Sequence, residues 1–230
     1  MDTLTPATKE PIVRTSVHDA VYQVLRNRIM HGVYRAGQVL GIQDIADNLD
    51  TSTMPVREAL RKLIAQQALE PMRSRSARIP LITPERLADL HRTRLLVEGK
   101  MTQWACDTQI SPEKLHHLKQ LAHDIHQSRT QPDGLTISLE LNRQFHFSIY
   151  ECAQSPVMLG IIESLWLQSG PYLREVQELC GAERAPIDDH HERLVDALVR
   201  NDAAAAKQAL KADISWPFEQ LLQLQTDSSK

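Results

Sequence analysis

A chain of 230 residues has room for one or two domains, and its composition changes near Pro80. Aromatic residues make up only 4%, and Leu, Ala, Ile and Val supply most of the apolar positions, which favours packed helices over a β-sandwich or barrel. No apolar run approaches the roughly 20 residues of a membrane-spanning helix, and residues 1–14 lack the apolar segment of a secretory signal. We therefore expect a cytoplasmic protein without membrane association.

The net charge of −3 conceals an uneven distribution. Residues 1–80 contain 11 Lys and Arg against 8 Asp and Glu, whereas the remainder contains 15 against 21. Positions 57–78 carry the densest basic group, which consists of Arg57, Arg61, Lys62, Arg73, Arg75 and Arg78. Such a surface suits phosphate binding. A solvated helix face followed by a charged turn would have the same composition.

Capping and proline signals predict three helices in the first part of the chain. The arm at residues 1–14 precedes a first helix that starts at the capping residue Ser16 and ends at Gly32. A short helix over 42–49 follows, and the next begins at Thr51-Ser52-Thr53 with a proline in its first turn. This arrangement predicts a helix-turn-helix.

Two short apolar segments follow the third helix, at residues 69–72 and 77–82. The basic stretch Arg73-Ser74-Arg75-Ser76 separates them, so we expect a β-hairpin. Residues 15–82 thus form the expected winged helix-turn-helix domain, and residues 83–230 the second domain.

Three similar punctuation signals mark helix starts in the second domain: Thr83-Pro84, Ser111-Pro112 and Ser155-Pro156 each place a hydroxyl cap before a first-turn proline. They contribute to an expected all-α bundle of about six helices, over residues 84–107, 112–129, 135–152, 156–178, 187–200 and 203–224. Loops are expected at Pro132-Asp133-Gly134 and at Gly181 to Pro186. The widely spaced Cys106, Cys152 and Cys180 lack a paired C-x-x-C arrangement and are expected to be reduced thiols.

The expected recognition helix carries candidate DNA contacts at its N-terminal end, which is the end that enters the major groove. Its candidates are Ser52, Thr53, Met54 and, one turn later, Arg57, which suits a guanine or a phosphate. Further basic candidates follow on the same helix and in the wing: Arg61, Arg73 and Arg75. The predicted partner is double-stranded DNA.

The stretch Met54-Pro55-Val56-Arg57-Glu58-Ala59-Leu60, with Leu40, Ile45, Ala46 and Leu49 before it, resembles the GntR family of winged-helix regulators. The resemblance covers Val21 to Ile82. We expect two chains to pair as a homodimer and to place their recognition helices on adjacent half-sites of an imperfect palindromic operator. This chain departs from the family where Thr53 replaces a base-reading arginine. Gln67 and Ser76 replace the glycines that the family uses in the two following turns.

A second group of polar residues lies in the helical part. Asn142 and His146 are four positions apart and so share one helix face. His191 and Asp213 stand about ten residues on either side of a turn near Asn201-Asp202, so an antiparallel hairpin would bring them level. Two imidazoles, a carboxylate and an amide oxygen suit a divalent transition metal, although lone histidines are commonly surface or core groups.

Residues 84–222 resemble the helical FCD ligand-binding domain of the FadR-type branch of the same family. The resemblance rests on Arg94-Leu95-Leu96-Val97-Glu98-Gly99, Asn142-Arg143-Gln144-Phe145-His146 and the segment from His191 to Leu198. It implies a metal, zinc or else nickel or manganese, held by Asn142, His146 and His191, with Asp213 in place of the usual last histidine. It also implies that Arg94 binds a small carboxylate effector, whereas a simple helical pair with Glu98 is the alternative.

These observations predict a sequence-specific transcription regulator and not an enzyme, acting as a repressor whose operator affinity is controlled by a small effector. One alternative is the same regulator with a metal-free effector pocket. The other is a metal-dependent hydrolase, for which His123-Asp124 would supply ligands.

Overall fold

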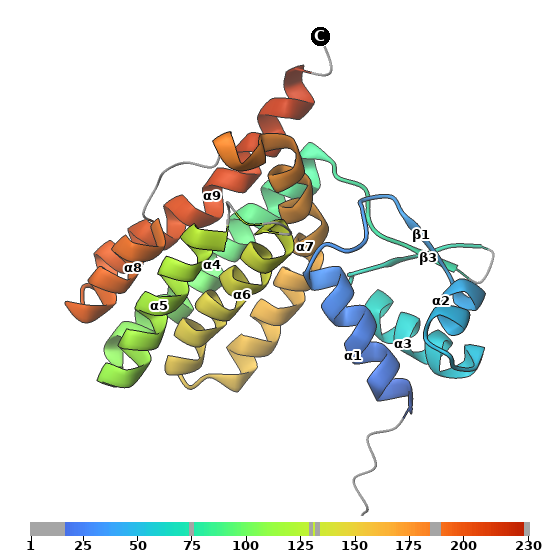
Figure 1. Ribbon diagram of the computed structural model, residues 1–230, viewed down its shortest axis with the longest axis horizontal. Coiled ribbons are helices and arrows are strands. Elements are labelled where there is room, and N and C mark those ends of the chain that lie inside the picture. The colour runs from blue at the N-terminus through green and yellow to red at the C-terminus, as the bar shows by residue number, and fades with distance from the viewer. Residues whose placement is uncertain (1–16, 74–75, 129–130, 132–133, 185–189, 228–230) are drawn as a thin grey trace, which may run out of the picture.

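The computed structural model describes residues 17–73, 76–128, 131, 134–184 and 190–227. It has two lobes, a smaller N-terminal one and a larger helical one (Figure 1). The expected arm at 1–14, the Ser16 cap and Arg75 lie outside the described residues. Within the described part, no helix combines the length and hydrophobicity needed to cross a membrane.

The N-terminal lobe combines three helices with a small antiparallel sheet. Its elements are α1 (Val17–Met30), β1 (Val39–Gly41), α2 (Ile42–Asn48), α3 (Thr53–Ala65), β2 (Glu70–Pro71) and β3 (Ser76–Arg78). The expected hairpin is present as β2 and β3, but the sequence analysis missed β1, which pairs with the other edge of β3. A strand of three residues is too short for an alternating pattern to reveal it.

The core of this lobe forms between α1 and α3. Leu25 and Ile29 of α1 are fully buried, as are Val56 and Leu63 of α3. Their spacing of four and seven residues places each pair on one helix face, which explains why the two helices pack together. The sheet then covers the end of this core through the buried Ala77.

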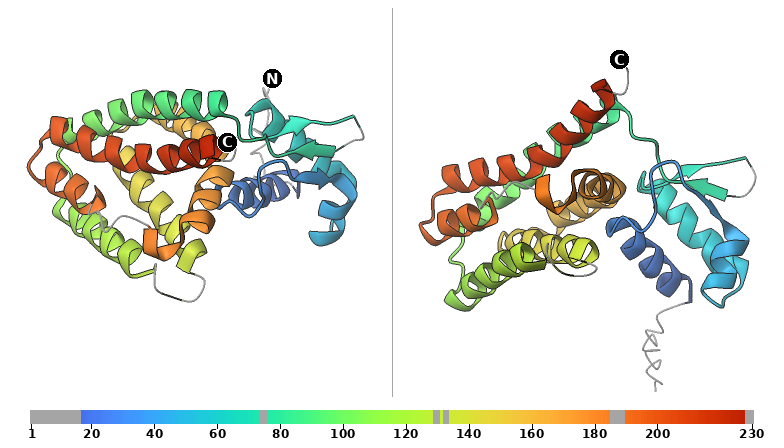
Figure 2. Two further views of the ribbon diagram at one scale, coloured as in Figure 1. Left: turned by 90° about the horizontal axis from the view of Figure 1, so that it is seen from above. Right: turned by 45° about the horizontal axis from the view of Figure 1, so that its top comes forward.

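The helical lobe contains the six expected helices. They are α4 (Pro84–Asp107), α5 (Pro112–Ser128), α6 (Gly134–Cys152), α7 (Pro156–Arg184), α8 (His190–Val199) and α9 (Ala203–Asp227). In all three views α9 runs along α4, and α8 lies at the end remote from the N-terminal lobe (Figures 1 and 2). The predicted caps are confirmed, because hydroxyl oxygens of Thr83, Ser111 and Ser155 each accept a backbone N–H three residues on.

The loop expected from Gly181 to Pro186 is wrong in its first part, because α7 continues to Arg184. A glycine inside a helix costs only about 1 kcal/mol, which tertiary packing readily offsets. Pro171 also lies inside α7, between Gly170 and the fully enclosed Tyr172. Local residue preferences therefore do not determine where this helix ends.

The two lobes meet where the end of α1 crosses α7. A Cβ added to Gly170 would collide with the carbonyl oxygens of Ile29 and Met30, and one added to Gly32 would lie 2.5 Å from the Arg174 Cβ. Gly32 also has a φ of +61°, which favours glycine. Two glycines therefore permit a direct approach of backbone to backbone between the lobes.

Arg86 of α4 adds a polar link across the same boundary. Its Nε donates to the Tyr172 hydroxyl at 2.7 Å, and its Nη2 donates to Gln168 at 3.1 Å and to the Gln67 carbonyl at 3.2 Å. Gln67 lies two residues after the end of α3, so α7 is connected through Arg86 to the turn that follows that helix. Further ion pairs between the lobes are Arg26–Glu163, His31–Glu140 and Arg35–Glu178.

We expect Gly170→Ala to lower the melting temperature, because the added methyl group overpacks the interface at a cost of about 1–3 kcal/mol. Gly160→Ala in the same helix is the matched control: its added Cβ meets nothing within 4 Å, so better helix propensity should stabilise by up to about 1 kcal/mol. Differential scanning calorimetry of both variants measures the effect. Equal shifts would contradict the close-approach interpretation.

Candidate DNA-binding surface and ligand site

The helix-turn-helix comprises α2, a tight turn and α3. Asp50 in the turn has a φ of +47°, a conformation that Asp tolerates better than most residues because of its short polar side chain. Ser52 has the extended backbone of an N-cap, and α3 begins at Thr53. The N-terminal end of α3 is accessible to a partner, because Ser52 and Met54 are exposed there.

The outer face of α3 presents both apolar and basic groups. Met54 is 65% exposed, which is unusual for a large apolar side chain and leaves it accessible to a partner. Ser52 is exposed, whereas Thr53 and Arg57 are partly buried. Arg61 is exposed and pairs with Glu58 at 2.6 Å.

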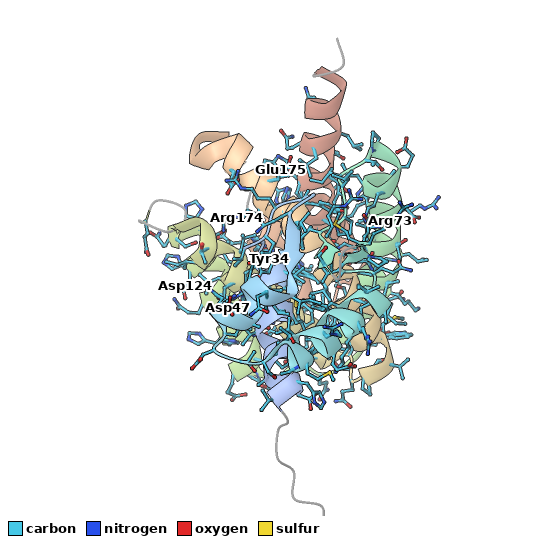
Figure 3. All side chains as sticks on the ribbon, turned by 90° about the vertical axis from the view of Figure 1, so that its right-hand side faces the viewer. Tyr34, Asp47, Arg73, Asp124, Arg174 and Glu175 are labelled. Atoms are coloured by element: carbon cyan, nitrogen blue, oxygen red, sulfur yellow. The ribbon has the colours of Figure 1, made fainter. Side chains whose placement is uncertain are left out.

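Helix α3 and the wing together offer fewer available cations than their sequence suggests. Arg78 of β3 pairs with Glu70 of β2 at 2.6 Å, and the Lys62 ammonium lies 4.0 Å from the centre of the Tyr22 ring. Arg73 remains exposed and lies at the edge of the lobe in Figure 3. Within the described residues, Arg57 and Arg73 make no ion pair, so they are the cations best placed for phosphate or base contacts.

Gln67 occupies a position where the resemblance led us to expect glycine. It has a φ of +58°, in the left-handed region that glycine adopts most easily. The turn therefore keeps the conformation although the glycine is absent, and Arg86 binds its carbonyl oxygen. Ser76, at the other replaced glycine, begins β3 opposite Gly41.

The candidate ligand site of the helical lobe forms between three helices. Asn142 and His146 come from α6, His191 from α8 and Asp213 from α9. The Nε2 of His146 lies 2.9 Å from the Asp213 Oδ2, and the Nε2 of His191 lies 3.3 Å from its Oδ1 and 2.8 Å from the Asn142 Oδ1. The four predicted residues therefore converge.

These groups perturb one another because they are largely shielded from water. Burial alone would raise the pKa of the Asp213 carboxyl, but the His191 and His146 imidazoles hold that pKa well below its ordinary value. His146 is only 1% exposed. The two imidazoles thus stabilise the ionised form of the Asp213 carboxyl inside this shielded site.

A small cavity of about 80 Å³ adjoins the four residues. Polar lining comes also from Arg94 and Ser138, and apolar lining from Leu173, Val176 and Trp216 among others. Ligand pockets for drug-sized molecules measure about 300–1,000 Å³. This cavity therefore suits an ion with water or a very small organic molecule.

Arg94 lines this cavity but is already engaged. Its Nε and Nη2 donate to the two oxygens of Glu98 at 2.6 and 3.2 Å. The guanidinium also lies over the Trp166 ring, 4.7 Å from its centre. The helical pair and the cavity-lining position, which the sequence analysis treated as alternatives, occur together.

The donor atoms fit a single divalent ion. Ligands of a tetrahedral zinc ion at about 2.1 Å lie roughly 3.4 Å apart, close to the separations between the Asp213 oxygens and the two imidazole nitrogens. One atom each from His146, His191 and Asp213 lies within 4.8 Å of the others. This group contains no cysteine thiolate, so metal ions that prefer nitrogen and oxygen ligands are favoured.

The remaining candidates lie elsewhere. His123 is exposed on α5, and its neighbour Asp124 accepts a hydrogen bond from Gln120. Among the described residues, the metal-compatible group is the one formed by His146, His191 and Asp213. The pair proposed for a hydrolase therefore has no metal-binding surroundings in the described chain.

Sequence reasoning missed Tyr150, whose hydroxyl lies between Glu98 and His146. Tyr150 is four residues after His146 and hence on the same helix face. That spacing was visible in the sequence, but its buried carboxylate partner on α4 was not.

Comparisons with known proteins agree with this architecture. Residues 18–79 match the family described as bacterial regulatory proteins, gntR family, and residues 89–215 match the FCD domain. The HTH-type transcriptional regulator McbR of Escherichia coli (strain K12) is 28% identical over 188 residues, which is 81% of this chain and 84% of that protein.

Two further relatives cover similar shares. The Exu regulon transcriptional regulator of Escherichia coli (strain K12) is 26% identical over 81% of this chain and 77% of its own length. The gluconate operon transcriptional repressor of Bacillus subtilis (strain 168) is 25% identical over 86% of each chain.

The solved structure of E. coli McbR/YncC superimposes with a TM-score of 0.80 at 25% identity, covering 94% of this chain and all of that chain. The GntR match lies in the N-terminal lobe, and the FCD match lies in the helical lobe. The chain belongs to the GntR family of bacterial transcription regulators, with a winged helix-turn-helix that binds operator DNA followed by a helical FCD domain, and it is not an enzyme.

Proposed function

We propose that this regulator is a repressor whose FCD domain binds a divalent transition metal together with a small carboxylate effector. The observation that carries the proposal is the convergence of Asn142, His146, His191 and Asp213 on one small cavity. These residues would hold the metal, which in turn would supply a Lewis-acidic position for a carboxylate oxygen. Zinc is the first candidate, and nickel and manganese are compatible with the same donors.

Arg94 would recognise the carboxylate from the other side of the cavity. Glu98 accepts one hydrogen from Nε and one from Nη2, so the two Nη1 hydrogens and the second Nη2 hydrogen are the donors left for an effector. A guanidinium that is already charge-balanced can bind an anion without leaving a buried charge unpaired when the effector departs. The cavity of about 80 Å³ restricts the effector to a few heavy atoms unless the helices move.

α7 offers a physical route from this cavity to DNA. Leu173 and Val176 line the cavity, whereas Gly170 and Tyr172 of the same helix contact the end of α1 and Arg86. A shift of α7 on effector binding would therefore change the position of the DNA-binding domain relative to the FCD domain. In a homodimer, that change would alter the spacing of two recognition helices over an imperfect palindrome.

Repression is favoured over activation by the relative that is named as the repressor of a gluconate operon. The departure at Thr53 argues against transferring an operator sequence from relatives. A metal-free pocket is the remaining alternative for the sensing step, since the His146–Asp213 pair can also form between an imidazolium and a carboxylate.

Arg57→Ala should weaken operator binding by about 1–3 kcal/mol, a roughly 5- to 150-fold loss, because a groove or phosphate contact is removed. Arg92→Ala is the control: Arg92 is exposed on α4, pairs with Asp89 and lies in the FCD domain. Fluorescence anisotropy at one salt concentration, on DNA selected by the wild-type protein, measures both. Equal affinities for Arg57→Ala and wild type would remove Arg57 from the interface.

Wild-type protein dialysed against zinc should retain about one ion per chain, and His146→Ala combined with His191→Ala should retain almost none, because a site left with two ligands binds zinc weakly. His123→Ala, which changes an exposed histidine on α5, should retain the wild-type amount. Elemental analysis by plasma mass spectrometry gives the content. A metal-free wild type would instead favour the metal-free pocket.

Small carboxylates such as acetate or lactate should raise the melting temperature of the zinc-loaded protein by several degrees, because saturation at 100 times Kd stabilises by about 2.7 kcal/mol. Acetamide and propane-1,2-diol are matched controls that lack the negative charge. Thermal-shift measurements with each compound compare them. Equal shifts from charged and neutral compounds would contradict the assignment of a carboxylate effector.

A further inference from the structure

We propose that Tyr150 and Glu98 are positioning residues that keep the proton of His146 on Nδ1, so that its Nε2 lone pair faces the ligand site. The inference rests on the metal site proposed above and deepens it. Neither Tyr150 nor Glu98 belongs to the lining of the cavity. Both act through His146, which does.

The direction of the Tyr150 hydroxyl follows from its partner Glu98. Glu98 is fully buried and receives four hydrogen bonds, from Arg94 Nε and Nη2, from the Tyr150 hydroxyl at 2.6 Å and from Trp166 Nε1 at 3.0 Å. An ionised carboxylate is the form that accepts all four. The single hydroxyl proton of Tyr150 therefore points to Glu98, in a short charge-assisted hydrogen bond.

Tyr150 has a single hydroxyl proton, and its 2.6 Å hydrogen bond to Glu98 uses that proton. The hydroxyl oxygen is thus left with lone pairs only for its second neighbour. That neighbour is His146 Nδ1, at 3.3 Å.

Two lone pairs facing each other would repel, so Nδ1 of His146 must carry a hydrogen and donate it to Tyr150. A neutral imidazole holds one proton, and its Nε2 is then an acceptor or a metal ligand. This nitrogen faces the Asp213 carboxylate at 2.9 Å. In this tautomer two atoms that carry lone pairs face each other at 2.9 Å, an arrangement that a bound cation between them would stabilise.

The chain Glu98–Tyr150–His146 has the arrangement by which a carboxylate outside a metal site fixes the ring and the tautomer of a ligating histidine, here with a phenol interposed. Loss of such an outer partner commonly costs about 10- to 100-fold in metal affinity. Trp166 and Arg94 hold the carboxylate in place. The relay therefore prepares the site before any ion arrives.

The test uses full-length protein and zinc ions, with affinity measured by competition against a chromophoric chelator. Tyr150→Phe should bind zinc about 10- to 100-fold more weakly than wild type. Tyr172→Phe is the control, because it removes an equally buried hydroxyl whose partner Arg86 lies outside the metal site. Wild-type affinity in Tyr150→Phe, or an equal loss in Tyr172→Phe, would overturn the proposal.

A second measurement separates this proposal from the metal site itself. Long-range ¹H–¹⁵N NMR of the zinc-free protein at pH 8 reports which ring nitrogen of His146 is protonated, with His146→Gln used to assign the signal. We expect Nδ1–H in wild type and a mixture of both tautomers in Tyr150→Phe. Nε2–H or a doubly protonated ring in wild type would overturn the relay, whereas Nδ1–H would support it even if the wild type bound no zinc.

Discussion

The hydrogen bonds of the buried Glu98 carboxylate connect the central helices of the FCD domain. It binds Arg94 of its own helix α4, Tyr150 of α6 and Trp166 of α7, so three helices meet at one charged group. Removing one member of a buried pair of this kind commonly costs about 3–5 kcal/mol, because the remaining charge is left without a partner. The same contacts determine how Arg94 and His146 face the cavity.

A second constraint is the close packing of the DNA-binding domain against α7. Flexible domain pairs usually meet through small polar interfaces. Here the backbone of α1 approaches α7 at Gly170, and Arg86 connects α7 with the carbonyl that follows the recognition helix. Since α7 also borders the cavity, the proposed ligand would change both surfaces together if it moved this helix.

Charged residues are arranged differently in the two domains. Not all basic residues near the wing are available to bind DNA, because Arg61 pairs with Glu58 and Arg78 pairs with Glu70. In the FCD domain, by contrast, charges are concentrated where burial strengthens their interaction. The proposed DNA-binding surface thus consists of a small set of cations that are unpaired within the described residues and of the exposed Met54, whereas the proposed ligand site consists of enclosed, mutually oriented groups.

The sequence by itself determined the features that depend on neighbours along the chain. Hydroxyl–proline pairs such as Thr83-Pro84 begin helices because capping involves only adjacent residues, and Asn142 and His146 share a face because of helix geometry. The motif from Met54 to Leu60 also identified the recognition helix. These signals were sufficient for the overall architecture and for the candidate site residues.

Only the tertiary structure decided the features that depend on residues distant in sequence. β1 exists because β3 offers it an edge. α7 continues through Gly181 to Arg184 although glycine disfavours a helix locally. The convergence of His191 and Asp213 with α6 required the packing of three helices, and Tyr150 gained its role only from Glu98, 52 residues away. Burial and hydrogen-bond direction arise from such contacts, so no local pattern encodes them.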